Sequence, residues 1–165
     1  MVRFATEQLW ECLSAVSDPE IPVISVVDLG IVRELTWLDT DVCEVTITPT
    51  YSGCPAMQVI AENVELALRS LGVQKISIRT QLSPAWTTDW MSPAGREKLK
   101  AYGIAPPMQS AIDISALGSR VVPDIACPQC GSLHTRLLSQ FGSTACKALY
   151  RCNECLEPFD YFKPH

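Results

Sequence analysis

Two pairs of cysteines near the C-terminus constrain the fold of this chain more than any other feature. Each pair has the spacing Cys-x-x-Cys, and 21 residues separate the pairs: Cys127, Cys130, Cys152 and Cys155. A tight turn of this kind lets two thiolates converge on one ion, and two such turns joined by a hairpin complete a tetrahedral shell. The separation is slightly longer than is usual for the pattern, but residues 133–141 and 147–150 can supply the strands of the hairpin. The sequence therefore predicts a metal-binding ribbon over residues 124–165.

The predicted ion is structural zinc, because four thiolates leave no open position for a substrate or a water. Four thiolates can also hold an iron–sulfur cluster, and that alternative stays open. A segment of about forty residues cannot bury enough apolar surface alone, so the metal would supply much of its folding free energy. The thiol of Cys146 could ionise more easily beside Lys147, or could join the shell. His134 could replace a ligand, although a surface histidine is the simpler interpretation.

Length and composition set the broad class of the protein. A chain of 165 residues can form a domain of about 120 residues with a small appendage. No apolar run approaches the roughly 18 residues of a membrane span, and the N-terminus has no signal-peptide stretch, so we expect a cytoplasmic protein. A reducing compartment favours metal ligands over disulfides for the eight cysteines. The net charge is −5 and the ribbon has no cluster of basic residues, which argues against nucleic-acid binding.

The first part of the chain, residues 1–107, has the pattern of a small α/β domain. Apolar residues recur at helical spacing or alternate at strand spacing in five segments: 4–16, 31–38, 42–48, 56–70 and 73–82. The resulting order α-β-β-α-β predicts two layers, a mixed sheet with the helices on one face. A third helix is expected from Pro93 to Tyr102, capped by Ser92. Residues 108–123 are expected to link this domain to the ribbon.

Cys54 is the candidate functional thiol of this domain, since Gly53-Cys54-Pro55 lies where a strand passes into a helix. N–H groups at a helix start stabilise a thiolate, so we expect a lowered pKa for Cys54. The residue could then be a nucleophile or a metal ligand, or it could simply pack at the turn. No histidine lies near it in sequence to serve as a base, so thiol-protease chemistry is poorly supported.

Three carboxylates lie in the loop that precedes the first strand: Asp18, Glu20 and Asp28. Such groups can ligate a metal or cap backbone N–H groups, and the sequence favours capping.

These residues carry a family resemblance. Asp18-Pro19-Glu20, Asp28-Leu29-Gly30 and the segment Thr50-Tyr51-Ser52-Gly53-Cys54-Pro55 together resemble the signature of the metal–sulfur cluster assembly domain family. This resemblance extends over residues 5–82. More narrowly, residues 84–90, residues 103–107 and the five-cysteine ribbon resemble the family of D subunits of phenylacetyl-CoA epoxidase systems.

The resemblance implies an accessory protein of aerobic phenylacetate degradation, which helps to assemble or maintain an iron–sulfur or di-iron centre in partner subunits. The implied partners are a di-iron oxygenase and an iron–sulfur flavin reductase. The family's reactive cysteine corresponds to Cys54, which would handle iron or a cluster transiently, and its acidic motif corresponds to Asp18, Glu20 and Asp28. The alternative is a non-catalytic scaffold that acts through the ribbon and through residues 84–90, the tryptophan loop, which contains Trp86 and Trp90. A homodimer stays open.

Two absences in the sequence agree with an accessory role. The chain has no Glu-x-x-His pair, which a di-iron oxygenase subunit would need on its helices. It also has no glycine-rich dinucleotide fingerprint, so a flavin or nicotinamide reductase is not expected. We therefore do not expect this chain to catalyse the oxidation itself.

Overall fold

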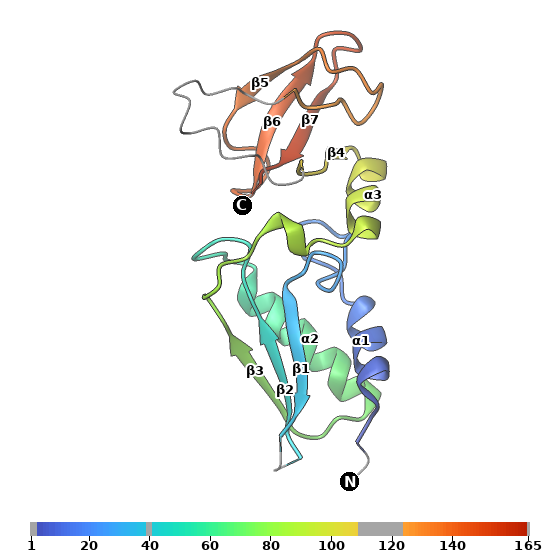
Figure 1. Cartoon of the computed structure of the whole chain (residues 1–165), viewed down its shortest axis with the longest axis vertical. Helices are drawn as coiled ribbons and strands as arrows, with labels where there is room; N and C mark the ends of the chain where they lie inside the picture. The colour runs from blue at the N-terminus through green and yellow to red at the C-terminus, as the bar shows by residue number, and fades with distance from the viewer. Residues whose placement is uncertain (1–2, 39–40, 109–123, 165) are drawn as a thin grey trace. The chain divides into compact units, whose positions relative to one another are not determined.

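The structure is a computed structural model, and it describes residues 3–38, 41–108 and 124–164. The chain divides into two compact units, Met1–Gly95 and Arg96–His165. In chain order the elements are α1 (Thr6–Ser14), β1 (Val32–Trp37), β2 (Cys43–Ile47), α2 (Met57–Leu71), β3 (Ile76–Thr80), the 3-10 helix η1 (Thr88–Trp90), α3 (Pro93–Tyr102), β4 (Ile104–Ala105), β5 (Thr135–Ser139), β6 (Lys147–Cys152) and β7 (Pro158–Phe162) (Figure 1). Within the described ranges, no helix is long and apolar enough to cross a membrane.

The first unit has the predicted mixed sheet, in the order β1-β2-β3. β1 and β2 are antiparallel, whereas β2 and β3 are parallel because α2 connects them as a crossover. The apolar stripe of α2 is buried at Ile60, Val64 and Leu68, and α1 packs beside it (Figure 1). Gly72 ends α2 with a φ of 113°, a conformation that glycine adopts without steric cost. The predicted order α-β-β-α-β is confirmed.

Between α1 and β1 the chain forms an ordered loop, which we call the front loop (residues 15–31). A bridge between Ser17 and Ser25 closes it, and the Asp18 N–H donates to the Ile24 carbonyl at 2.9 Å. Apolar side chains anchor the loop in the core of the unit: Ile21, Ile24, Val26, Leu29 and Ile31. The front loop therefore holds its polar side chains at fixed positions.

Residues 86–95, which follow β3, pack on the front loop. Trp86 is buried, and its indole N–H donates to the Leu29 carbonyl at 3.0 Å. The Arg33 guanidinium lies 3.5 Å from the ring centroid of Trp90. Gly30 has a φ of +75°, and a Cβ there would be 2.5 Å from the Trp90 carbonyl oxygen. Only glycine fits at this crossing without displacement.

The second unit is built on a four-stranded sheet in the order β4-β7-β6-β5. The sequence indicated β5 and β6. It did not indicate β7 or the two-residue β4, which pairs in parallel with β7. Because β4 joins this sheet, the boundary between the two units falls after residue 95 rather than after the expected residue 107. Apart from Met108, the expected linker over 108–123 lies outside the described residues.

The buried core of the second unit brings cysteines and aromatic rings together. Its members are Ala105, Ile125, Cys127, Ala148, Tyr150, Cys152, Phe159 and Tyr161, with Leu137 packed against them. The ring of Tyr150 stacks on Phe159, with centroids 6.0 Å apart, and meets Tyr161 edge to face at 5.6 Å. Two of the predicted metal ligands therefore belong to the apolar core itself.

Candidate functional site

Two tight turns present the four predicted metal ligands of the second unit. In the first turn the Gly131 N–H donates to the Cys127 carbonyl at 2.9 Å, and Gly131 has a φ of +77°. The second turn follows β6, where the Cys152 N–H donates to the Glu157 carbonyl at 3.0 Å and Leu156 has a φ of +66°. Both turns thus close on a left-handed residue, which points the cysteine side chains inward.

The four sulfur atoms have the spacing that a tetrahedrally coordinated metal ion requires. The Sγ atoms of Cys127, Cys130, Cys152 and Cys155 all lie within 4.8 Å of one another. The sulfurs of Cys127 and Cys155 are 3.7 Å apart, and those of Cys130 and Cys152 are 3.5 Å apart. Zinc–thiolate bonds of about 2.3 Å at tetrahedral angles place sulfurs about 3.8 Å apart. The residues therefore fit a four-thiolate metal ion, and the chain has a metal-binding site here.

The protonation of these thiols shows why an ion is needed to complete the group. Burial disfavours the Cys152 thiolate, but N–H groups of Cys155 and Glu154 and neighbouring thiols outweigh it and lower the pKa of Cys152 to about 6. For Cys155 the Glu157 N–H favours the thiolate, yet desolvation and the other three cysteines prevail and raise its pKa to about 12. Four thiolates at this spacing would repel one another, so a cation is required to hold them together.

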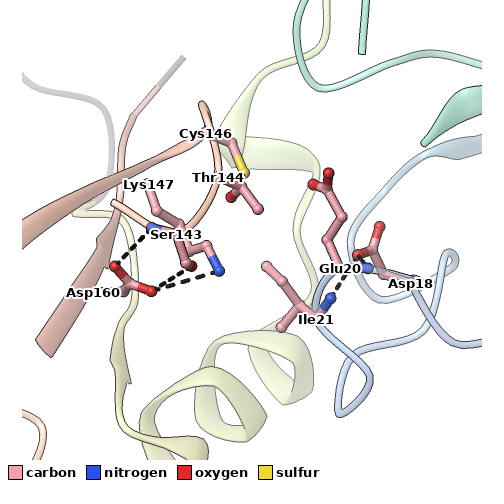
Figure 2. A network of polar contacts seen from close by, with 8 residues as sticks. All are labelled: Asp18, Glu20, Ile21, Ser143, Thr144, Cys146, Lys147 and Asp160. Atoms are coloured by element: carbon pink, nitrogen blue, oxygen red, sulfur yellow. Dashed lines mark hydrogen bonds and ion pairs between the residues drawn. The ribbon is translucent and has the colours of Figure 1, made fainter. Parts of the chain in front are cut away.

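Cys146 is not part of this group of four. Its thiol is buried and lies 3.0 Å from the Thr144 hydroxyl. Lys147 is also buried and forms an ion pair with Asp160 at 3.6 Å, and Asp160 accepts a hydrogen bond from the Ser143 hydroxyl at 2.7 Å (Figure 2). Lys147 is thus engaged with a carboxylate, and the structure does not bring Cys146 to the metal ligands as a fifth one.

His134 is a surface residue, as the simpler interpretation of the sequence expects. Its Nδ1 lies 3.0 Å from the Glu154 carboxylate, and both side chains are exposed. It does not belong to the four-sulfur group.

In the first unit Cys54 lies between the carboxyl end of β2 and the start of α2, a place where crossover folds bind ligands. A turn closed by the Cys54 N–H donating to the Tyr51 carbonyl at 3.2 Å fixes its backbone. The half-buried thiol also receives hydrogen bonds from the Tyr51 side chain and the Ala56 N–H, and it feels the charges of Glu20 and Asp18. Two of the three predicted carboxylates, those of Glu20 and Asp18, therefore lie within electrostatic range of Cys54.

The predicted lowering of the Cys54 pKa is wrong. Burial is the largest influence and raises the pKa, and the carboxylates of Glu20 and Asp18 act in the same direction. The Ala56 N–H and the Tyr51 hydrogen bond favour the thiolate but do not outweigh burial. The helix begins only at Met57, so Cys54 precedes the first turn where the helix dipole acts. Sequence reasoning also missed Tyr51, because a side chain inside a turn gives no periodic signal.

The three carboxylates have different partners. The Asp18 Oδ1 accepts hydrogen bonds from the N–H groups of Glu20 and Ile21, both at 2.8 Å, which is the expected capping role (Figure 2). The Asp28 carboxylate accepts from the Ser92 hydroxyl at 2.7 Å. The acidic motif is therefore divided between the thiol and the start of α3.

The charge of Glu20 gives a direct test of this arrangement. Replacing Glu20 with Gln removes a negative charge that raises the pKa of Cys54, so more thiolate should form at a given pH. We expect Cys54 in Glu20→Gln to react faster with iodoacetamide at pH 8, as measured by peptide mass spectrometry. Glu62→Gln on the exposed side of α2 is the matched control. Equal rates in all three proteins would contradict the electrostatic influence of Glu20 on the thiol.

Two family models match the chain, one in each unit. The model described as iron-sulfur cluster assembly protein matches residues 6–78, which include Cys54 and all three carboxylates. The model described as PaaD zinc beta ribbon domain matches residues 114–163, which include the four metal ligands. The two candidate sites thus fall in two separately recognised domains.

Shorter relatives correspond to the first unit. A protein from Porphyromonas gingivalis named Fe-S protein maturation auxiliary factor is 37% identical over 87 residues, which are 52% of this chain and 82% of the relative. The crystal structure of a domain of unknown function, DUF59, from Bacillus anthracis has a TM-score of 0.52 at 29% identity, over 56% of this chain and 89% of that chain.

A longer relative covers both units. An Escherichia coli K12 protein, provisionally named as the D subunit of 1,2-phenylacetyl-CoA epoxidase, is 47% identical over 169 residues, which are 99% of this chain and 99% of the relative. The identity extends through the iron–sulfur assembly domain and the ribbon, including the segment between them. The chain therefore belongs to the family of phenylacetyl-CoA epoxidase D subunits.

Proposed function

We propose that the protein is an accessory factor that helps to load or maintain an iron–sulfur or di-iron centre in other subunits of a phenylacetyl-CoA epoxidase system. The observation that carries this proposal is the arrangement at Cys54, a half-buried thiol with Tyr51 beside it and two carboxylates within electrostatic range. It lies inside the region that matches iron–sulfur assembly proteins. The names of the relatives support the same role.

The residues around Cys54 suit transient rather than permanent binding of iron, which is the cargo here. At rest, burial and the charges of Glu20 and Asp18 keep the thiol protonated. An incoming iron cation would be attracted by the two carboxylates and would favour the thiolate, whose proton passes to water. The Tyr51 and Ala56 donors would then stabilise the sulfur charge. Cys54 is therefore a thiol that becomes a ligand when cargo arrives.

Zinc is the resident ion that we propose for the four-cysteine site, with a structural role. Cys127, Cys130, Cys152 and Cys155 would hold it, and their four thiolates leave no position for a substrate. When bound, the ion supplies folding free energy to the ribbon rather than reactivity.

The proposed partners are the di-iron oxygenase and the iron–sulfur flavin reductase of the same system. An alternative function is a scaffold between them, with no thiol chemistry. Exposed apolar side chains on the ribbon favour this alternative, namely Leu133, Phe141 and Leu156. The tryptophan loop does not favour it, because Trp86 is buried and Trp90 stacks under Arg33.

The variant Cys54→Ser separates the two functions. Serine nearly matches cysteine in volume, so fold and ribbon metal should be retained. If Cys54 handles iron, partner subunits purified from cells with this variant should contain several-fold less iron, and epoxidase activity should fall with it.

Cys12→Ser is the matched control, since Cys12 is also partly buried but its thiol only donates to the Ala67 carbonyl at 3.3 Å. Pull-down of both variants with the partner subunits shows whether the surfaces are intact. Full iron loading with Cys54→Ser would overturn the assembly function and leave the scaffold.

A further inference from the structure

The start of α3 is held by the front loop through three hydrogen bonds. The Ser92 N–H donates to the Asp28 carbonyl at 2.8 Å, and the Ser92 hydroxyl donates to the Asp28 carboxylate at 2.7 Å. The same Ser92 oxygen accepts from the Gly95 N–H at 2.9 Å, as the N-cap of a helix does. Asp28 therefore orients the hydroxyl group that caps α3.

Close packing reinforces this contact. A Cβ on Gly95 would lie 3.0 Å from the Ile24 side chain and 3.1 Å from the Asp28 carbonyl oxygen. The next two residues of the front loop contact the same segment, since the Leu29 carbonyl accepts from Trp86 and Gly30 lies against Trp90. Residues 28–30 thus form a surface on which residues 86–95 pack, rather than a free acidic loop.

The three carboxylates of the front loop therefore have two different roles. Glu20 and Asp18 act on the thiol of Cys54, whereas Asp28 is bonded to Ser92. A hydrogen-bond acceptor is what the Ser92 hydroxyl requires of Asp28, and an amide oxygen can accept as well as a carboxylate oxygen. A ligand for iron would instead require the charge.

We propose that Asp28 and Ser92 form a latch that fixes the first turn of α3 to the front loop, with Asp28 as a positioning residue and not a ligand of the cargo. The latch holds the loop that carries Asp18 and Glu20, so Asp28 supports the thiol site indirectly. This second part rests on the proposed function, whereas the latch itself does not.

Amide hydrogen exchange at Gly95 tests the latch without any assay of function. Loss of an N-cap weakens the helix start by about 1 kcal/mol, which corresponds to about fivefold faster exchange. We expect this acceleration in Ser92→Ala and in Asp28→Ala, with no further gain in the double variant, because both remove one connected contact. Asp28→Asn should stay within about twofold of the wild type. Ser70→Ala, at the exposed end of α2, is the control.

Two results would overturn the latch. One is that Asp28→Asn exchanges as fast as Asp28→Ala, which would mean that the charge is required. The other is that Ser92→Ala leaves Gly95 protected as in the wild type. Ser92→Ala keeps the test decisive even if Asp28→Ala fails to fold.

Iron content of the partner subunits tests the positioning role. We expect full iron loading with Asp28→Asn and a matching decrease with Ser92→Ala and Asp28→Ala. Lost iron loading in Asp28→Asn with Gly95 still protected would show that the charge of Asp28 takes part in handling iron. That result would overturn the proposal. If Cys54→Ser also leaves loading unchanged, the proposed function has failed, and hydrogen exchange at Gly95 still decides the latch.

Discussion

Removing the metal from the ribbon is expected to unfold the four-stranded sheet while the sheet of the first unit stays folded. Cys127 and Cys152 belong to the buried core of the second unit, so loss of the ion removes the group that holds the two Cys-x-x-Cys turns and that core together. Structural zinc contributes about 10–16 kcal/mol to the folding of small zinc domains. Cys152→Ser or a strong chelator should therefore abolish amide protection in β5, β6 and β7. Protection in β1, β2 and α2 should persist, because that unit has its own core.

Elemental analysis of the same samples identifies the ion. We expect about one zinc for each chain in the wild type and none in Cys152→Ser. Equal amounts of iron and sulfide would show a cluster instead. Cys146→Ser is the matched control, because Cys146 is buried in the same unit but lies outside the four-sulfur group. Loss of metal in that control, or loss of both units together in Cys152→Ser, would contradict the structure.

Gly30→Ala is expected to have the second largest effect, on the first unit. The backbone of Gly30 is left-handed, which costs an alanine about 1–2 kcal/mol, and the added Cβ would be 2.5 Å from the Trp90 carbonyl oxygen. Such overpacking costs about 1–3 kcal/mol more. We expect the free energy of unfolding to fall by roughly 2–5 kcal/mol in urea titrations followed by tryptophan fluorescence.

Gly53→Ala is the control for that experiment, since Gly53 has a φ of +81° with open space around its Cβ position. It carries the backbone cost without the contact. Equal decreases in the free energy of unfolding in both variants would show that residues 86–95 move away from Gly30 at no cost. That result would contradict the packing of residues 86–95 on residues 28–30.

Much of the fold follows from local patterns in the sequence. Helical spacing in α2 and alternation in β2 depend on neighbours along the chain, so both elements were predicted close to their observed bounds. The four metal ligands were predictable for the same reason, because two Cys-x-x-Cys turns are local units. By contrast, β4 has two residues and exists only because β7 pairs with it. No pattern over two residues can indicate such a strand.

The candidate thiol site was predictable in its membership more than in its chemistry. Cys54 and the acidic motif were identifiable as residues, but the pKa of Cys54 depends on burial and on carboxylates more than thirty positions away in sequence. The partner of Asp28 is likewise Ser92, 64 residues further along the chain. Which carboxylate meets the thiol and which meets a helix start is decided by tertiary packing.

The buried pair of Lys147 and Asp160 has a consequence for the alignment of β6 and β7. Asp160 faces Leu149 in the pairing, so it lies diagonally across from Lys147 on the same side of the sheet. Sliding one strand by a single residue would turn the carboxylate to the opposite side and leave a buried ammonium group without its partner, at a cost of several kcal/mol. The ion pair thus favours the same register as the apolar core, because a slip by one residue would also turn Phe159 and Tyr161 away from Ala148 and Tyr150.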